Sequence, residues 1–348
     1  MDHAAAPIQY RAITEVAQLP AQDAFALATL PLTYLPAITL AAEQGIDGTW
    51  NRSMLTVPSA RSGHFEGVGT VTAVRRLLEC GWDREAPPFI RARRVLFRLL
   101  AEDDDPGFLF ELAGKQPDED LAHRGRTVLR EAAAAALAQA GYEGDPRLRG
   151  AARRMLDRVA AYLESPLAEK PFVRMGNQHV LPPEASPPSI HLLHMLAHMP
   201  LFRTEHHETM EMVYAHLTQP LPRQEPLQRF GRHVLAQPHL ILGDMLPHRN
   251  AAEDDVVSAV MWLELMARLG FLKRNDGWCR LFERFLDERD DAGVWHPRRG
   301  TAVPRSSNPF VWPMYPLEAH QTGEEKWTDL TFRLGLIARL AGRRIEVV

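Results

Sequence analysis

Three consecutive acidic residues precede an apolar helical segment in the last third of the chain. Glu253, Asp254 and Asp255 lead directly into residues 256–270, where apolar side chains recur at helical spacing. Crowded carboxyl groups raise one another's pKa, so one of them can stay protonated and act as a general acid. Acidic residues also favour the first turn of a helix, because the helix dipole attracts negative charge. The sequence leaves both roles open.

A second group of candidate residues consists of histidines at spacings of three and four. His191, His194 and His198 share one face of a predicted helix over residues 187–199, and imidazole groups on one face can bind a metal ion. His191 lies in the first turn and His198 roughly two turns further on, so one ion bound by all three is not expected. We therefore predict histidines that line a cavity or the core, and no metal site.

An aspartate run at residues 103–105 could bind magnesium and a diphosphate. The helix pattern places Asp103, Asp104 and Asp105 in a turn between two helices, so a solvated turn is the favoured interpretation. The chain has no G-x-x-x-x-G-K-[ST], G-x-G-x-x-G or G-x-S-x-G motif. No cofactor is predicted, and magnesium is expected only if the substrate carries a diphosphate.

The composition is that of an ordinary globular protein. The 348 residues are 45% hydrophobic and 24% charged, and the formal net charge is -4, so no basic field attracts nucleic acid. Two cysteines, Cys80 and Cys279, make no disulfide framework. The sequence shows no signal peptide and no apolar run near the roughly 20 residues that span a bilayer. We expect a cytoplasmic protein without an integral membrane span.

Helical periodicity dominates the chain, and strand signals are scarce, so the predicted fold class is all-α. One helical hairpin recurs. Its first helix ends at a glycine, an aromatic residue follows, and a short polar link leads to a second helix rich in Arg and Leu. The glycine–aromatic pairs are Gly81–Trp82, Gly141–Tyr142 and Gly270–Phe271. A supersecondary unit used several times is typical of helical repeat architectures.

The links from one hairpin to the next also recur. Residues 44–50 read Q-x-x-x-G-x-W, and residues 289–295 keep Gly293 and Trp295 at the same spacing. Residues 103–109 keep Gly107, with Phe108 as a displaced aromatic. The spacing before the last link, at residues 289–295, is longer than the others, and a Pro-rich insertion at residues 220–247 would account for the additional residues.

These residues resemble the terpenoid cyclase and protein prenyltransferase superfamily. QGIDGTW at residues 44–50, RDDAGVW at 289–295 and the terminal WTDLTFRLGLIARLAG carry the resemblance, which covers about residues 30–345. The family's QW turn joins an outer helix to an inner helix of an α/α toroid. The resemblance implies a single toroid domain over residues 1–348, with five to six helical hairpins. Residues 1–30 then form an N-terminal extension or an extra helix.

The implied outer helices lie near residues 31–43, 88–102, 145–163, 204–218 and 275–288. The implied inner helices lie near residues 66–80, 124–141, 187–199, 253–270 and 326–342. Inner helices of such a ring line a central, mostly apolar cavity, where ligands bind.

In this family the chemistry lies at the N-terminal ends of the inner helices. Residues 252–255 resemble the acidic D-x-D-D signature of class II cyclases, which places Asp254 on the proton donor and Asp255 on its neighbour. The sequence departs from the signature because its first acid is Ala252, and Glu253 is the nearest compensating carboxylate. Val256 and Val257 stand where a zinc-binding cysteine is needed, so the family's zinc site is expected to be absent.

The other inner-helix starts supply candidate substrate-binding residues. Trp262, Trp327 and Phe332 are aromatic rings that could stabilise a carbocation, or that belong to the ordinary core. The polar candidates are His64, His123, His191, His194 and Asp329.

The leading hypothesis is a terpenoid-cyclase-like protein that binds a small hydrophobic, isoprenoid-type molecule. If it is an enzyme, Asp254 starts the cyclisation as a general acid. One alternative is a sugar-active lyase, epimerase or hydrolase on an α/α toroid, which the histidine content favours. Another is a non-catalytic toroid scaffold, which the missing first aspartate favours. A wet, polar cavity would favour the sugar-active alternative, and a partner domain or subunit stays open.

Overall fold

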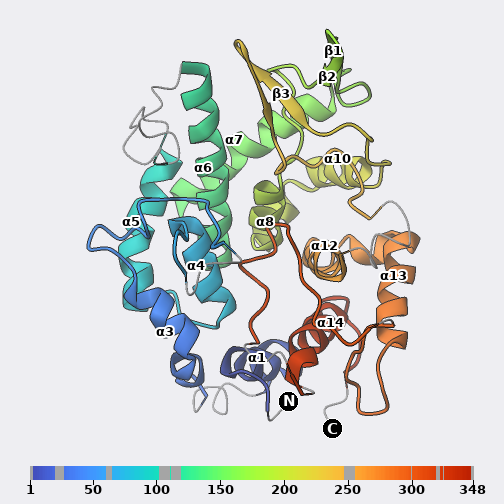
Figure 1. Ribbon diagram of the computed structural model, residues 1–348. Helices are drawn as coiled ribbons and strands as arrows, with labels where there is room; N and C mark the ends of the chain where they lie inside the picture. The colour runs from blue at the N-terminus through green and yellow to red at the C-terminus, as the bar shows by residue number, and fades with distance from the viewer. Residues whose placement is uncertain are drawn as a thin grey trace. The chain divides into compact units, whose positions relative to one another are not determined.

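The computed structural model describes residues 3–19, 27–59, 65–101, 110, 119–246, 255–298, 300–318, 322–323 and 325–345. This part of the chain is mostly helical, with a few short strands, in agreement with a mainly-α fold (Figure 1). The chain divides into two compact units. Unit 1 comprises Met1–Asn51, Thr56–Ile90 and His248–Val348, and unit 2 comprises Arg52–Leu55 and Arg91–Pro247.

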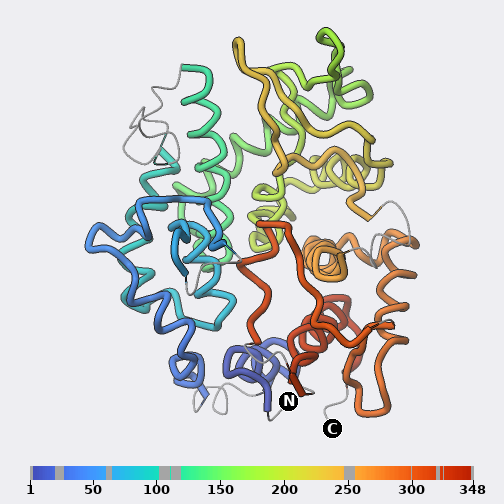
Figure 2. Tube along the Cα trace, in the orientation of Figure 1, coloured from blue at the N-terminus to red at the C-terminus, as the bar shows by residue number. Residues whose placement is uncertain are grey.

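Unit 1 brings the first and last described helices together. Figure 2 shows α1 and the π-helical η1 beside α14, and residues of both elements contact α14. The remaining predicted helices of this unit are also found, within a few residues of the expected bounds. The elements are α1 (Ala6–Arg11), η1 (Ala12–Ala17), η2 (Leu30–Thr33), α3 (Leu35–Ala42), α4 (Thr70–Glu79), α12 (Val256–Arg268), η5 (Leu272–Arg274), α13 (Asp276–Asp287), η6 (Glu325–Trp327) and α14 (Thr328–Leu340).

Unit 2 contains most of α5 and two further helical hairpins. Its most extensive helix contact joins α6 to α8, where consecutive buried alanines over residues 132–136 let the two backbones approach closely. The helices are α5 (Pro87–Leu100), α6 (Glu119–Gln139), α7 (Pro146–Leu163), α8 (Ile190–Ala197), α9 (Pro200–Glu205) and α10 (His207–Leu217).

Two antiparallel β-hairpins in unit 2 were not predicted. They pair β1 (Val173–Met175) with β2 (Gln178–Val180), and β3 (Leu227–Phe230) with β4 (His233–Ala236). Gly176 and Gly231 have positive φ in the two-residue loops, as tight hairpins require. The second hairpin lies inside the Pro-rich insertion, which is therefore structured where it is described.

The predicted helix ends at glycine are confirmed in atomic detail. Gly81, Gly141 and Gly270 have φ of 81°, 81° and 79°, a left-handed conformation that suits glycine. In each case the aromatic residue that follows donates its backbone N–H five residues back, which closes the helix with a Schellman motif. The three bonds run from Trp82 to Leu77, from Tyr142 to Leu137 and from Phe271 to Met266, at 3.1, 3.1 and 2.8 Å.

The links at residues 44–50 and 289–295 have the same geometry. Gly48 and Gly293 have φ of 84° and 79°, and each accompanying tryptophan is buried. The backbone N–H of Trp50 donates to Thr70 Oγ1 at 3.1 Å, and that of Trp295 donates to Thr331 Oγ1 at 3.0 Å. Each link therefore fixes the start of the following helix, α4 or α14, through one threonine.

None of the helices in the described part of the chain is long and apolar enough to cross a membrane.

Candidate functional site

Asp255 is the described member of the predicted acidic triplet, and it caps α12. Its Oδ1 accepts the backbone N–H of Ser258 at 2.9 Å, and its Oδ2 accepts the hydroxyls of Ser258 and Ser306 at 2.9 and 2.6 Å. Glu253 and Asp254 lie outside the described residues. The carboxylate of Asp255 is therefore engaged in starting the helix and holding residue 306 beside it.

The predicted cavity aromatics are buried in unit 1. Trp262 packs edge-on against Trp278, with ring centroids 6.2 Å apart, and Trp327 packs edge-on against Trp295 at 6.0 Å. Phe332 is also buried, and the guanidinium groups of Arg11 and Arg333 lie 5.1 and 5.3 Å from its ring centroid. The cations that contact the Phe332 ring are side chains of the protein itself.

Asp329 holds an irregular segment against the start of α14. Its Oδ2 accepts the backbone N–H groups of Leu317 and Glu318 at 2.5 and 3.4 Å. Only 1% of the residue is exposed, and this burial raises the pKa of the carboxyl group, against the opposing effect of Arg333. Among the described residues, Oδ1 has no hydrogen-bond partner and lies 3.9 Å from Arg333 Nε.

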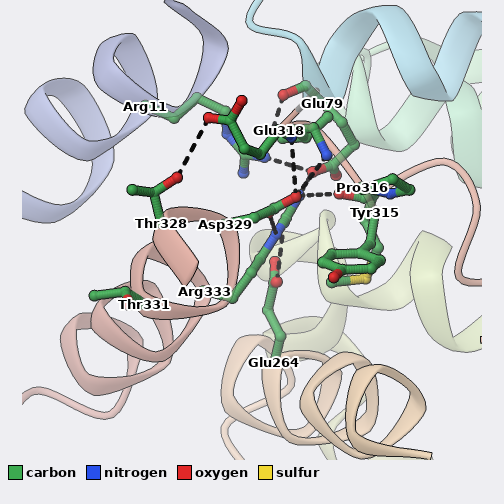
Figure 3. Close-up of polar contacts among 12 residues, drawn as sticks. Arg11, Glu79, Glu264, Tyr315, Pro316, Glu318, Thr328, Asp329, Thr331 and Arg333 are labelled. Atoms are coloured by element: carbon green, nitrogen blue, oxygen red, sulfur yellow. Dashed lines mark hydrogen bonds and ion pairs between the residues drawn. The ribbon is translucent and has the colours of Figure 1, made fainter. Parts of the chain in front are cut away.

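A network of buried charges joins four helices of unit 1, and Figure 3 shows its side chains pointing toward one another. Arg333 of α14 donates to Glu79 of α4 at 2.7 Å and to Glu264 of α12 at 3.1 Å. Arg11 of α1 reaches the same Glu79 oxygen at 2.5 Å. The Arg333 side chain is 0% exposed, and those of Glu79 and Glu264 are 9% exposed.

The carboxylates of this network remain ionised. Burial opposes ionisation, yet Arg11 and Arg333 hold the pKa of Glu79 well below its usual range. In the same way Arg333 and Arg268 lower the pKa of Glu264 against burial. Because the charges satisfy one another in a closed interior, this network is a structural centre of unit 1.

A different arrangement in unit 2 brings a guanidinium group and two imidazole rings together. His191 of α8 stacks on His239, with ring centroids 6.2 Å apart and an interplanar angle of 26°. Arg124 of α6 places Nη2 2.9 Å from His239 Nε2 and donates from Nε to Gln237 Oε1 at 3.1 Å. A guanidinium only donates, so His239 Nε2 is the acceptor and its proton is on Nδ1. We call Arg124, His191 and His239 the Arg–His group.

The environment keeps His239 neutral. Burial is the largest effect, and the nearby Arg124 and His191 add to it, so the pKa of His239 lies well below its ordinary value. Burial also lowers the pKa of Arg124, although a guanidinium stays charged at any physiological pH. The group thus pairs a permanent cation with a neutral imidazole.

The structure brings only some of the predicted polar residues to this group. His191 belongs to it, and His123 is exposed on α6 next to Arg124 in the sequence. His194 is part-buried on α8, where its carbonyl oxygen lies 2.9 Å from His198 Nδ1. His64 lies outside the described residues. Arg124 follows His123 at a predicted inner-helix start, but its contact with His239 was not predicted, because that proximity depends on how the Pro-rich insertion returns to α6.

Within the described ranges, no three His, Cys, Asp or Glu side chains gather in a way that could hold a metal ion. The absence of a metal site and of a cofactor therefore stays a prediction for the chain as a whole.

Comparison with protein-family models, with curated proteins and with solved structures gave no match. The superfamily resemblance therefore rests on the sequence residues that carry it. What the chain does has to be inferred from the Arg–His group and from the charges inside each unit.

Proposed function

We propose that the Arg–His group binds a polar substrate that carries a carboxylate, of the sugar-acid class, and that the protein is a lyase or epimerase. The 2.9 Å contact between Arg124 and the neutral His239 carries this proposal. In this contact the guanidinium group of Arg124, which can bind an anion, lies directly beside the acceptor nitrogen of His239, which can act as a base. Such a pair suits proton abstraction next to a carboxylate.

The chemistry follows from competition for Arg124. A guanidinium pairs with a carboxylate through two parallel hydrogen bonds, which are stronger than its single contact with a neutral imidazole. When Arg124 turns to the substrate carboxylate, Nε2 of His239 becomes available to take the proton from the adjacent carbon. Arg124 then stabilises the charge that develops on the carboxylate. His191, stacked on His239, fixes the plane of the ring.

The polar character of the surrounding helices supports a polar substrate. Glu131, two turns beyond Arg124 on α6, accepts hydrogen bonds from Arg158 and from Ser189 Oγ, both at 2.6 Å. These side chains contrast with the dry aromatic wall that a hydrocarbon cation needs.

The test uses two methyl glycosides that differ at one carbon. Methyl D-galacturonide carries a carboxylate where methyl D-galactoside carries a hydroxymethyl group. We expect calorimetry to show binding of the uronide alone, and NMR in deuterated water to show exchange of its C5 proton. Arg124→Gln should abolish binding, and His239→Gln should abolish exchange while binding remains. His179→Gln, which changes an exposed histidine of β2 in the same unit, is the matched control. Equal binding of both glycosides, or of neither, would refute the proposal.

Acid-initiated cyclisation of an isoprenoid is the second candidate, and the shared geometry of the Trp50 and Trp295 links favours it. In this proposal the hairpins close into one α/α toroid of a cytoplasmic protein, and Asp254 donates the proton. Mass spectrometry with linear isoprenoids and prenyl diphosphates, with and without magnesium, should then show a cyclised product that Asp254→Asn no longer forms. Failure of both tests would favour a non-catalytic scaffold.

A further inference from the structure

The surface of unit 2 has an arginine-lined concavity of about 540 Å³ where the second half of α5 meets the link between α6 and α7. Its lining consists of four arginines, two aromatic residues and one aspartate: Arg93, Arg94, Arg98, Arg147, Phe97, Tyr142 and Asp145. Concavities of this size hold small organic ligands. The composition of the lining indicates which ligand chemistry the site would bind.

Two of the guanidinium groups are held in place by the protein. Arg147 lies 3.8 Å from the centroid of the Phe97 ring, and its Nε and Nη2 donate to the two carboxylate oxygens of Asp145 at 3.1 and 2.8 Å. Arg93 donates to the hydroxyl of Tyr142 at 3.1 Å. These contacts fix the planes of both guanidinium groups. The two arginine side chains would therefore lose little conformational freedom when a ligand binds.

The charge of the lining favours an anion. Arg94 and Arg98 lie one turn apart on α5, are exposed, and line the same concavity. The single carboxylate, Asp145, also caps α7 by accepting the backbone N–H of Arg147 at 2.9 Å. Four permanent cations around one partly neutralised carboxylate attract negative charge from solution.

We infer that this concavity binds the diphosphate group of a small molecule. A guanidinium matches a phosphate with two parallel hydrogen bonds, and adjacent phosphates present enough oxygens for several guanidiniums at once. The site is separate from the Arg–His group, because Tyr142 follows the last residue of α6, Gln139, and Arg124 lies about 22 Å before Gln139 along the helix (15 residues at 1.5 Å each). The inference therefore does not depend on the proposed carboxylate chemistry.

The experiment is a calorimetric titration of the full chain with inorganic pyrophosphate, with orthophosphate for comparison. We expect pyrophosphate to bind more tightly than orthophosphate. The double variant Arg94→Gln/Arg98→Gln should weaken pyrophosphate binding by about tenfold or more, because each charged hydrogen bond contributes more than a neutral one. The matched control is Arg91→Gln/Arg153→Gln, which removes the same charge from exposed positions of α5 and α7 outside the concavity. It should bind within about twofold of the parent protein.

A third variant tests the sign of the effect. Asp145→Asn keeps a good helix-capping residue but removes the only negative charge of the lining, so pyrophosphate affinity should rise. Equal weakening by both double variants would mean attraction by general charge and would overturn the inference, as would no binding at millimolar pyrophosphate. Binding that Arg124→Gln abolishes but Arg94→Gln/Arg98→Gln leaves unchanged would place the anion at the Arg–His group instead.

Discussion

The guanidinium group of Arg333 lies 2.7 Å from the carboxylate of Glu79, although 254 residues separate them in the sequence. The pair joins α14 to α4, and Arg11 brings α1 to the same carboxylate. Ionised groups that leave water must be matched by opposite charges, because the cost of desolvation is several kcal/mol for each ion. Glu79 is therefore the point where three distant parts of unit 1 depend on one side chain.

We predict that Glu79→Gln destabilises the protein strongly. The neutral amide leaves Arg11 and Arg333 without their shared anion, and removing one partner of a buried ion pair typically costs about 3–5 kcal/mol of unfolding free energy. Glu264 still pairs with Arg333, so the lower part of that range is expected. Urea unfolding at pH 7 measures the loss.

The matched control for this prediction is Glu85→Gln. Glu85 is exposed and lies 3.5 Å from Arg84, so its replacement should change the unfolding free energy by less than about 1 kcal/mol. If Glu79→Gln and Glu85→Gln lower the free energy of unfolding by similar amounts, the network does not hold α1, α4 and α14 together.

Two glycines with nearly the same backbone conformation should respond differently to alanine. Gly270 has φ of 79° and open space around an added Cβ. Gly270→Ala should therefore lower the free energy of unfolding by about 1–2 kcal/mol, the cost of holding alanine in the left-handed conformation. Gly81 has φ of 81°, and a Cβ there would lie 2.7 Å from Tyr10 Cδ1. Gly81→Ala should therefore lower the free energy of unfolding by about 1–3 kcal/mol more than Gly270→Ala does, because overpacking adds to the backbone strain.

Thermal unfolding of these variants, and of Gly81→Ala combined with Tyr10→Ala, separates the two effects. The additional replacement removes the clashing ring and leaves Pro31 Cγ at 3.2 Å as the remaining tight neighbour, so the further effect of Gly81→Ala in that background should shrink toward the value seen at Gly270. Equal losses at both glycines in the parent chain would show that Tyr10 does not pack against Gly81.

The helices could be predicted from sequence because their signals are local. Gly81, Gly141 and Gly270 follow apolar residues at helical spacing, and the Schellman bonds at all three connect residues only a few positions apart. The two β-hairpins also had a local signal, a glycine in each two-residue loop at Gly176 and Gly231. Their strands of three and four residues are too short for alternation to stand out against a helical background.

The charged contacts could not be predicted because they join distant segments. Arg333 lies between Phe332 and Leu334 in an apolar helix, which marks it as unusual, but nothing in the sequence identifies Glu79 and Glu264 as its partners. Arg124 and His239 are likewise 115 residues apart. His191 was a predicted site residue, but its neighbour His239 lies in the Pro-rich insertion at residues 220–247, and the sequence does not show where that insertion folds.

We predict that the hydroxyl of Thr70 stabilises the Trp50 link. Thr70→Val keeps the shape of the side chain but removes the acceptor for the buried N–H of Trp50, and an unsatisfied buried donor costs about 1–3 kcal/mol. Thr331→Val should act similarly on Trp295, because the two bonds are equivalent. Hydrogen exchange followed by NMR should show faster exchange of the Trp50 or Trp295 amide in the corresponding variant.

Thr204→Val is the control for these threonines. Thr204 is exposed, and its hydroxyl donates only within α9, to Pro200 O at 3.0 Å. This variant should leave both tryptophan amides protected. Unchanged protection in Thr70→Val would mean that Trp50 does not depend on α4 for its hydrogen bond.

Stability should fall as the pH falls below about 6.5, because two histidines are held neutral in the folded chain. Burial lowers the pKa of His216, whose Nε2 lies 3.0 Å from Ile241 O, and burial with Arg124 and His191 lowers that of His239. Below the unfolded pKa the unfolded chain binds protons that the folded chain does not, so protonation favours unfolding. Each histidine should contribute about 1.4 kcal/mol per pH unit between its unfolded and folded pKa values.

Chemical unfolding at pH values between 5 and 7.5 tests this dependence. The carboxylates of Glu79 and Glu264, whose pKa values are lowered, lose their contribution only at lower pH, since the unfolded value is about 4.3. His216→Gln and His239→Gln should each make the profile shallower, and their effects should add because the two side chains have different hydrogen-bond partners. His179→Gln, at an exposed position, should reproduce the parent slope. Parallel profiles for all four proteins would mean that neither buried histidine is held neutral by the fold.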